Sequence, residues 1–179
     1  MSWKKTLILV VAAVLVNILL AELNMFFKLP LFLDSIATAV IAALFGPAVG
    51  VAVALLTQAG FELIHGFNGM FAPWVVCSIA TALIVGFAAR RGYFHTPFQA
   101  IVIGFLVALA NALLGAIVHI SVYNSFSGHA VDMLVQGFEL LIGSRFWAAL
   151  WARIPMNLLD KGLAVLIAYI FSRRLFREP

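Results

Sequence analysis

Charged residues are scarce in this sequence, and cysteine occurs only once. Only 10% of the 179 residues are charged and 65% are hydrophobic, whereas a soluble domain of this size carries about a quarter charged residues. The composition therefore excludes a water-soluble globule. Cys77 has no partner cysteine, which excludes an intrachain disulfide and a cysteine metal cluster.

The motifs of several enzyme classes are also missing. The sequence contains neither the GxxxxGK[ST] phosphate loop of ATPases nor a GxSxG nucleophile elbow, and no low-complexity run marks a second module. The histidines follow neither HxxxH nor HExxH spacing, so no metal site is expected; they are His65, His95, His119 and His129. We expect one integral membrane domain, residues 1–179, with no enzymatic activity and no cofactor.

Long apolar stretches are what the sequence has in abundance. A transmembrane helix needs about 20 predominantly apolar residues, and short polar breaks divide the chain into several such stretches. We expect an all-α membrane protein, a bundle of six transmembrane helices, at about residues 6–26, 34–46, 47–64, 73–89, 98–122 and 152–171. The first helix is expected to be retained, because it is long and lacks a convincing small-residue cleavage site.

Basic residues gather before the first expected helix, between the fourth and the fifth, and after the sixth. These three clusters contain Lys4, Lys5, Arg90, Arg91, Arg173, Arg174 and Arg177. Because lysine and arginine concentrate in cytoplasmic loops, an even number of crossings separates each cluster from the next. Both termini are therefore expected on the cytoplasmic side of a prokaryotic plasma membrane. The net charge of +4 reflects this topology, and no nucleic-acid partner is expected.

The second expected helix is unusually short. It begins at Asp34 or Ser35, either of which can cap it, and it ends at Gly46 before Pro47. Its length of about 13 residues covers about 20 Å of a hydrocarbon core about 30 Å thick. Either a cavity or re-entrant loop adjoins this helix, or an extended apolar approach at residues 29–33 completes the span.

Residues 131–151 precede the last expected span and have a different pattern. Apolar residues recur there at helical spacing opposite polar ones, which predicts an extra amphipathic helix on the outer surface or over the bundle. A seventh crossing in this segment would place the C-terminal arginines outside, against the charge pattern.

Polar side chains inside membrane helices are costly, so they mark either packing contacts or a binding site. Here they concentrate toward the expected outer ends of the helices, together with aromatic residues that can stack on a planar ring. We expect a ligand pocket in this outer half, closed by the loop at 65–69 and the segment after Tyr123. The candidate ligand-binding residues are Glu62, His65, Asn68, Trp74, Asn111, His119, Tyr123, Asn157 and Asp160.

For several of these residues a structural role is equally open. Arg153, Asn157 and Asp160 share one stripe of the last helix, with Lys161 beside Asp160, and such charges can simply pair with one another. A lone asparagine such as Asn111 more often bonds to another helix than to a ligand. A haem or metal cargo held by residues from different helices is a weaker alternative.

Two stretches of the sequence resemble a known family. LPLFLDSIATAVIAALFGPAVGVAVALLTQ, residues 29–58, and IPMNLLDKGLAVLIAYIFSRR, residues 154–174, are similar to the substrate-binding S components of energy-coupling factor (ECF) vitamin transporters. The chain length, the short second helix and the long outer segment before the last helix agree with that family. The resemblance implies the S-component fold and a membrane-embedded subunit that binds a vitamin or related micronutrient from outside.

The resemblance also implies partners. S components of this kind act with a transmembrane T component and two cytoplasmic ATPases, and they are thought to topple in the membrane to release their cargo. The T component contacts small residues at AxxxA spacing on the first helix, a spacing occupied here by Ala13, Asn17 and Ala21. The alternative is a small stand-alone secondary transporter or channel, although such transporters often contain an internal repeat and none is visible here.

Overall fold

A computed structural model of the protein describes residues 3–123 and 127–175, and helices joined by short loops make up this part. In chain order the elements are α1 (Trp3–Phe26), α2 (Ile36–Phe45), α3 (Pro47–Ile64), the short 3-10 helix η1 (Ala72–Trp74), α4 (Val75–Arg90), α5 (Pro97–Ser121), α6 (Val131–Ile142) and α7 (Arg145–Leu175). No strand occurs in the described ranges, so the all-α prediction is confirmed there. Met1, residues 124–126, Arg177 and Pro179, to which the topology and pocket predictions also refer, lie outside the described residues.

The turn between α2 and α3 forms where the sequence predicts it. Gly46 has a φ of 92°, which favours glycine, and Pro47 lies in the first turn of α3, where its missing N–H costs nothing. Ser35 precedes α2 but makes no capping hydrogen bond with its side chain. Its hydroxyl instead accepts a bond from Lys161, so a tertiary contact replaces the expected cap.

Among the described residues, five helical segments are long and apolar enough to cross a membrane: Trp3–Phe26, Pro47–Ile64, Ala72–Arg90, Pro97–Ser121 and Arg145–Arg174. In contrast, α2 has only 10 residues, which cover about 15 Å at 1.5 Å per residue. That is about half of a hydrocarbon core. A sixth crossing that includes α2 therefore stays a prediction.

The segment before the last span is divided into two helices, which differs from the single helix expected at 131–151. α6 ends at Gly143, whose φ of 71° is the left-handed conformation that commonly ends helices. α7 begins at Arg145 and continues for 31 residues with Pro155 inside it, so it starts well before the expected position 152. The location of α6 relative to a membrane surface stays a prediction.

Glycine allows α2, α3 and α4 to approach closely. A Cβ atom added at Gly50 of α3 would lie 2.6 Å from the Cβ of Ala42, and one added at Gly86 of α4 would lie 2.6 Å from the Cα of Pro47. Lipid tails are as apolar as the helix surfaces, so the hydrophobic effect does not drive helices together in a membrane. Small residues promote their association because they allow the backbones to pack closely. These two glycines therefore set the spacing of the α2–α3–α4 layer.

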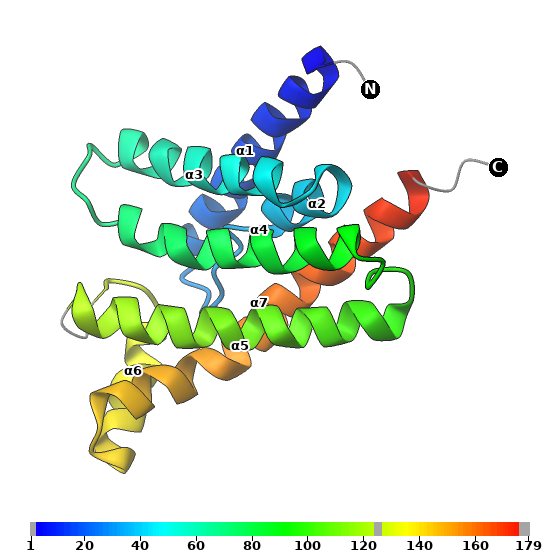
Figure 1. The fold of residues 1–179 in the computed structure, drawn as a ribbon. Helices are drawn as coiled ribbons and strands as arrows, with labels where there is room; N and C mark the ends of the chain where they lie inside the picture. Colours follow the sequence, from blue (N-terminus) through cyan, green and yellow to red (C-terminus); the bar gives the residue numbers. More distant parts are fainter. Residues whose placement is uncertain (1–2, 124–126, 176–179) are drawn as a thin grey trace.

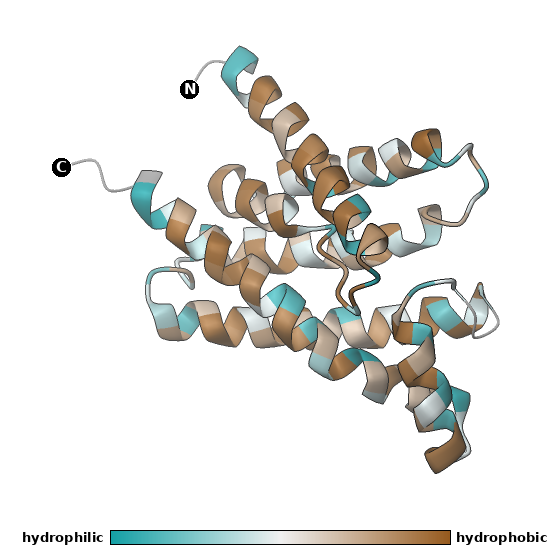
Figure 2. Ribbon diagram, turned by 180° about the vertical axis from the view of Figure 1, so that it is seen from behind, coloured by the Kyte–Doolittle hydropathy of each residue, from teal (hydrophilic) through white to brown (hydrophobic). Residues whose placement is uncertain are grey.

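The two ends of the bundle carry different elements. Figure 1 shows the first turn of α1, the α4–α5 loop and the last turns of α7 towards one end, and the α3–α4 loop and α6 towards the other. Hydrophobic residues cover much of the helices between these ends, whereas the first turn of α1 and the last turns of α7 are hydrophilic (Figure 2). The described members of the three basic clusters consequently lie towards the same end.

Candidate ligand-binding site

A cavity of about 710 Å³ lies towards the end of the bundle that carries the α3–α4 loop. Its wall combines the C-terminal half of α1, the connection before α2, the end of α3, the α3–α4 loop, residues 127–130 and parts of α4 to α7. This volume is within the range of about 300–1,000 Å³ that is typical of small-molecule sites. The cavity is therefore the candidate ligand-binding site.

Aromatic rings form a large part of the cavity wall. Phe32 stacks on His129 with ring centroids 5.1 Å apart, and Phe61 stacks on Phe71 at 5.3 Å. The ring of Trp74 also lines the cavity. Rings that are held in place by such stacking offer flat apolar faces on which a planar heterocycle can pack.

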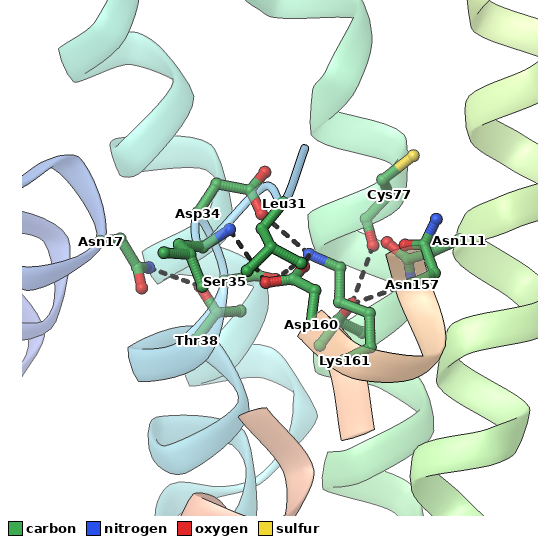
Figure 3. Close-up of polar contacts among 12 residues, drawn as sticks. Asn17, Leu31, Asp34, Ser35, Thr38, Cys77, Asn111, Asn157, Asp160 and Lys161 are labelled. Atoms are coloured by element: carbon green, nitrogen blue, oxygen red, sulfur yellow. Dashed lines mark hydrogen bonds and ion pairs between the residues drawn. The ribbon is translucent and has the colours of Figure 1, made fainter. Parts of the chain in front are cut away.

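A buried ion cluster adjoins the cavity (Figure 3). Lys161 Nζ lies 2.9 Å from Asp34 Oδ1 and 2.7 Å from Asp160 Oδ2, and it donates a hydrogen bond to Ser35 Oγ at 2.7 Å. Asp160 Oδ1 accepts a bond from the backbone N–H of Leu33 at 3.0 Å. These contacts join α7 to the segment before α2 and leave one negative charge in excess within the cluster.

The approach to α2 is part of the cavity wall. Residues 29–35 contain no helix, and Leu29, Phe32 and Asp34 line the cavity. The side-chain amide N–H of Asn24 on α1 donates to the carbonyl of Leu31 at 2.6 Å, which satisfies one backbone group of this non-helical segment. A cavity therefore adjoins the short helix, as one of the two interpretations expects; that residues 29–33 complete the span stays a prediction.

Three buried amide side chains at the cavity wall have an oxygen without a hydrogen-bond partner among the described residues. These atoms are Asn24 Oδ1, Gln58 Oε1 and Asn111 Oδ1. The amide nitrogen of Asn111 donates to the carbonyl of Val107 at 2.9 Å and to Thr81 Oγ1 at 3.1 Å, which fixes its orientation. A buried polar atom without a partner costs about 1–3 kcal/mol, and a ligand with N–H or O–H groups recovers that cost.

A family model described as the S component of the ECF-type riboflavin transporter matches residues 3–177. The chain belongs to this S-component family. No curated protein matches the chain, and no solved structure does. The predicted resemblance is confirmed: the chain is the substrate-binding subunit of an ECF importer, a multi-pass membrane protein and not an enzyme.

Five of the residues predicted to bind ligand line the cavity of this S component. They are His65, Asn68, Trp74, Asn111 and Asn157, and the fold brings them together from the α3–α4 loop, η1, α5 and α7. The amide nitrogen of Asn157 donates to the carbonyl of Arg153 at 2.9 Å, so its oxygen remains available to a ligand.

Glu62, another predicted ligand contact, bonds to the loop that follows it, and its contact with a ligand stays a prediction. Its carboxylate accepts backbone hydrogen bonds from Gly69 at 2.9 Å, Phe71 at 2.7 Å and Ala72 at 2.8 Å. These three bonds use most of its acceptor capacity. Glu62 is not part of the cavity lining, and its position fits a role in shaping the loop beside the cavity.

Three further predicted residues also lie outside the lining and have contacts within the protein. Asp160 belongs to the ion cluster described above, and His119 is buried with its Nδ1 3.7 Å from Asp132 Oδ1. Tyr123 stacks on Trp74 at 5.3 Å and donates its hydroxyl to the carbonyl of Met70. Partial burial raises the pKa of Tyr123 to about 12, so the hydroxyl keeps its proton and acts as a donor.

The residues predicted to contact the T component lie on the buried face of α1. Asn17 is 0% exposed; its amide nitrogen donates to Thr38 Oγ1 at 2.8 Å, and its oxygen accepts the backbone N–H of Ala37 at 2.9 Å. Ala13 is buried in the core and Ala21 lines the cavity. In this structure the stripe packs against the chain's own helices, so a partner can reach it only if α1 moves.

The prediction left out several residues that line the cavity, above all Arg153 and Lys161 on α7 and Asp34 before α2. The four-residue spacing of Arg153, Asn157 and Lys161 places them on one helix face, which is a signal present in the sequence. Asp34 has no such local signal, because its partner Lys161 lies 127 positions away.

Proposed function

We propose that this S component binds riboflavin or a closely related flavin from outside the cell and delivers it inward with a T component and two cytoplasmic ATPases. The matching family is named for riboflavin transport. The observation that carries the proposal is that flat aromatic walls and buried amide oxygens without partners occur in one cavity. A flavin combines a planar ring system with N–H and O–H donors, so it satisfies both features at once.

The proposed orientation places this cavity on the outer side of the membrane. It is supported by the basic clusters, whose described members lie towards the opposite end of the bundle from the α3–α4 loop (Figure 1). Basic residues favour the cytoplasmic side. The cavity would then face the medium, from which a capture subunit must take its vitamin.

Titration with riboflavin tests the binding proposal, because flavin fluorescence is quenched when the ring stacks on an aromatic side chain. The purified protein is compared with Trp74→Ala and with Trp147→Ala. Trp147 is a matched control, since it is an exposed tryptophan of α7 that does not line the cavity. We expect Trp74→Ala to weaken binding about 2- to 12-fold, as loss of about 0.5–1.5 kcal/mol of stacking predicts, and Trp147→Ala to leave it unchanged.

Two results would overturn the proposal. One is the absence of saturable riboflavin binding by the wild-type protein in its folded form, as judged by gel filtration. The other is an equal loss of affinity in both tryptophan variants, which would place the flavin outside the cavity.

A further inference from the structure

A second cavity lies at the opposite end of the bundle from the proposed flavin site, beside the α4–α5 loop. Its volume is about 450 Å³, which is within the range of small-molecule sites. The end of α2, Gly46, the end of α4, the α4–α5 loop and the last turn of α7 form its wall. Within residues 3–123 and 127–175 the two cavities share no lining residue, so flavin binding does not account for the second cavity.

The wall of the second cavity is basic. Arg90 and Arg173 contribute two positive charges, and none of the described residues that line it is acidic. The carboxylates of the described part bond to donors elsewhere; they belong to Glu22, Asp34, Glu62, Asp132, Glu139 and Asp160. This part of the chain therefore supplies the two arginines with no counter-ion.

Arg90 packs against the turn between α2 and α3. A Cβ atom added at Gly46 would clash with Nε, Cζ and Nη2 of Arg90, so the lack of a side chain there lets the guanidinium lie against the backbone. The carbonyl end of α2 has a partial negative charge that also favours a cation at this place. Neither Arg90 nor Arg173 forms a hydrogen bond or an ion pair with another described residue, so their N–H donors stay available to a ligand.

Contacts with α7 hold the α4–α5 loop, which forms another part of the wall. The buried ring of Phe94 lies edge-on to that of Tyr169, with centroids 5.8 Å apart, and the Tyr169 hydroxyl donates to the carbonyl of His95 at 3.3 Å. Thr96 and Gln99 form a capping box at the start of α5. Because these contacts fix the loop, the second cavity is preformed, which lowers the entropic cost of binding.

Exposed apolar residues adjoin the basic wall along the chain. Ile170 and Phe171 on α7 are 48% and 51% exposed, and Phe98 at the start of α5 is 74% exposed. Figure 2 shows that the last turns of α7 are hydrophilic, whereas hydrophobic residues cover much of the bundle between its ends. The hydrocarbon core of a membrane meets its head-group layer at such a boundary. A ligand with both an anionic group and apolar chains therefore fits this position better than a soluble anion does.

We propose that the second cavity binds the phosphate group of an anionic membrane lipid. Two guanidinium groups from different helices offer planar pairs of N–H donors that match phosphate oxygens. Basic pockets between transmembrane helices at the cytoplasmic surface are sites for anionic lipid head groups in other proteins, and the proposed topology puts this end of the bundle on the cytoplasmic side. The lipid site is separate from the flavin site, so either proposal can fail without the other.

Native mass spectrometry of the purified full-length chain in non-ionic detergent tests the proposal. Phosphatidylglycerol is compared with phosphatidylcholine of the same acyl chains, whose choline group the arginines repel, and with glycerol 3-phosphate, which has no acyl chains. We expect phosphatidylglycerol to bind more tightly than either. Its advantage over phosphatidylcholine should be about 10-fold, as one additional charge-assisted bond predicts.

A double variant with Arg90→Gln and Arg173→Gln removes both charges from the wall of the second cavity. The matched control carries Arg91→Gln and Arg174→Gln, since Arg91 and Arg174 are exposed neighbours in the same basic clusters and do not line the second cavity. The first double variant should weaken binding of phosphatidylglycerol at least about 10-fold, and the control should weaken it less than about threefold. Arg173→Gln alone should show a smaller loss in the same direction, and it decides if the first double variant does not fold.

Three results would overturn the proposal. Equal affinity of the wild type for the two lipids would show that the anionic head group is not recognised. Equal losses in the two double variants would assign lipid binding to the net charge of this end of the bundle and not to the second cavity. Binding of glycerol 3-phosphate as tightly as phosphatidylglycerol would assign the second cavity to a soluble phosphate ester.

Discussion

Lys161 Nζ lies 2.9 Å from Asp34 Oδ1, although the two residues are 127 positions apart in the chain. The pair joins the middle of α7 to the segment that enters α2, and both residues line the cavity. Because each partner is buried or largely buried, the contact fixes the shape of the cavity wall as well as the packing of the two elements.

Lys161→Met should destabilise the protein by about 3–5 kcal/mol, because it leaves the carboxylates of Asp34 and Asp160 without their counter-ion. Thermal unfolding in detergent measures this change. Arg145→Gln serves as the control: it removes an exposed ion pair, which contributes at most about 1 kcal/mol. Equal unfolding temperatures for the two variants would contradict a stabilising role of the Lys161 cluster.

Glu62→Gln should loosen the loop that follows α3. The carboxylate accepts the backbone N–H groups of Gly69, Phe71 and Ala72, whereas a glutamine oxygen is a single neutral acceptor. Hydrogen exchange followed by mass spectrometry should therefore show faster exchange at these three amides. Glu22→Gln is the control, because within the described residues the Glu22 carboxylate bonds only to the His65 side chain, and in this variant the exchange rates should stay at the wild-type level. Unchanged rates in both variants would rule out a role of Glu62 in holding the loop.

The helices of this S component could be predicted from the sequence, but the inner wall of its cavity could not. Apolar length and the Gly46–Pro47 step determine α1 to α5 locally, so their bounds agree closely with expectation. Gly143, in contrast, divides the expected amphipathic helix, because a left-handed glycine can end a helix whose apolar pattern continues. Ser35 bonds to Lys161 and Asn17 bonds to Thr38. Both are contacts between residues distant in sequence, which no local pattern reveals.

Stability should fall in mildly acidic solution because of His129. This residue lies between α5 and α6, and burial, assisted by the positive charge of Arg153, lowers its pKa below the ordinary value of 6.5. The unfolded chain therefore takes up a proton at a higher pH than the folded protein does. The stability linked to this histidine is complete above pH 6.5 and is lost as the pH falls through the lower folded pKa.

His129→Phe offers a direct measurement of that effect, since a phenylalanine can keep the stacking on Phe32 but cannot take up a proton. Unfolding temperature recorded between about pH 5 and pH 7 should vary less in His129→Phe than in the wild type. His95→Phe, at an exposed position of the α4–α5 loop, should keep the wild-type dependence. If the unfolding temperature of His129→Phe depends on pH as strongly as that of the wild type, another group causes the loss of stability in acid.

Riboflavin should accumulate only when the partner subunits are present. The sequence has no phosphate loop for ATP hydrolysis, and we predict that the chain alone binds its ligand but does not drive it against a gradient. Proteoliposomes that contain this chain by itself should show binding without uptake, and adding a T component with its two ATPases and ATP should start uptake. Uptake by the chain alone, driven by protons or sodium, would favour a secondary transporter.

The proposed topology can be tested with single cysteines, because Cys77 is the only native one. Cys77→Ala provides the background; Asn68→Cys then marks the α3–α4 loop and His95→Cys the α4–α5 loop, both exposed positions at opposite ends of the bundle. If the basic clusters face the cytoplasm, a membrane-impermeant maleimide should label Asn68→Cys in intact cells and His95→Cys only after permeabilisation. Asn68 also lines the cavity, so riboflavin should slow its labelling if the cavity is the binding site. Labelling of His95→Cys in intact cells would invert the orientation and put the cavity on the wrong side for capture from the medium.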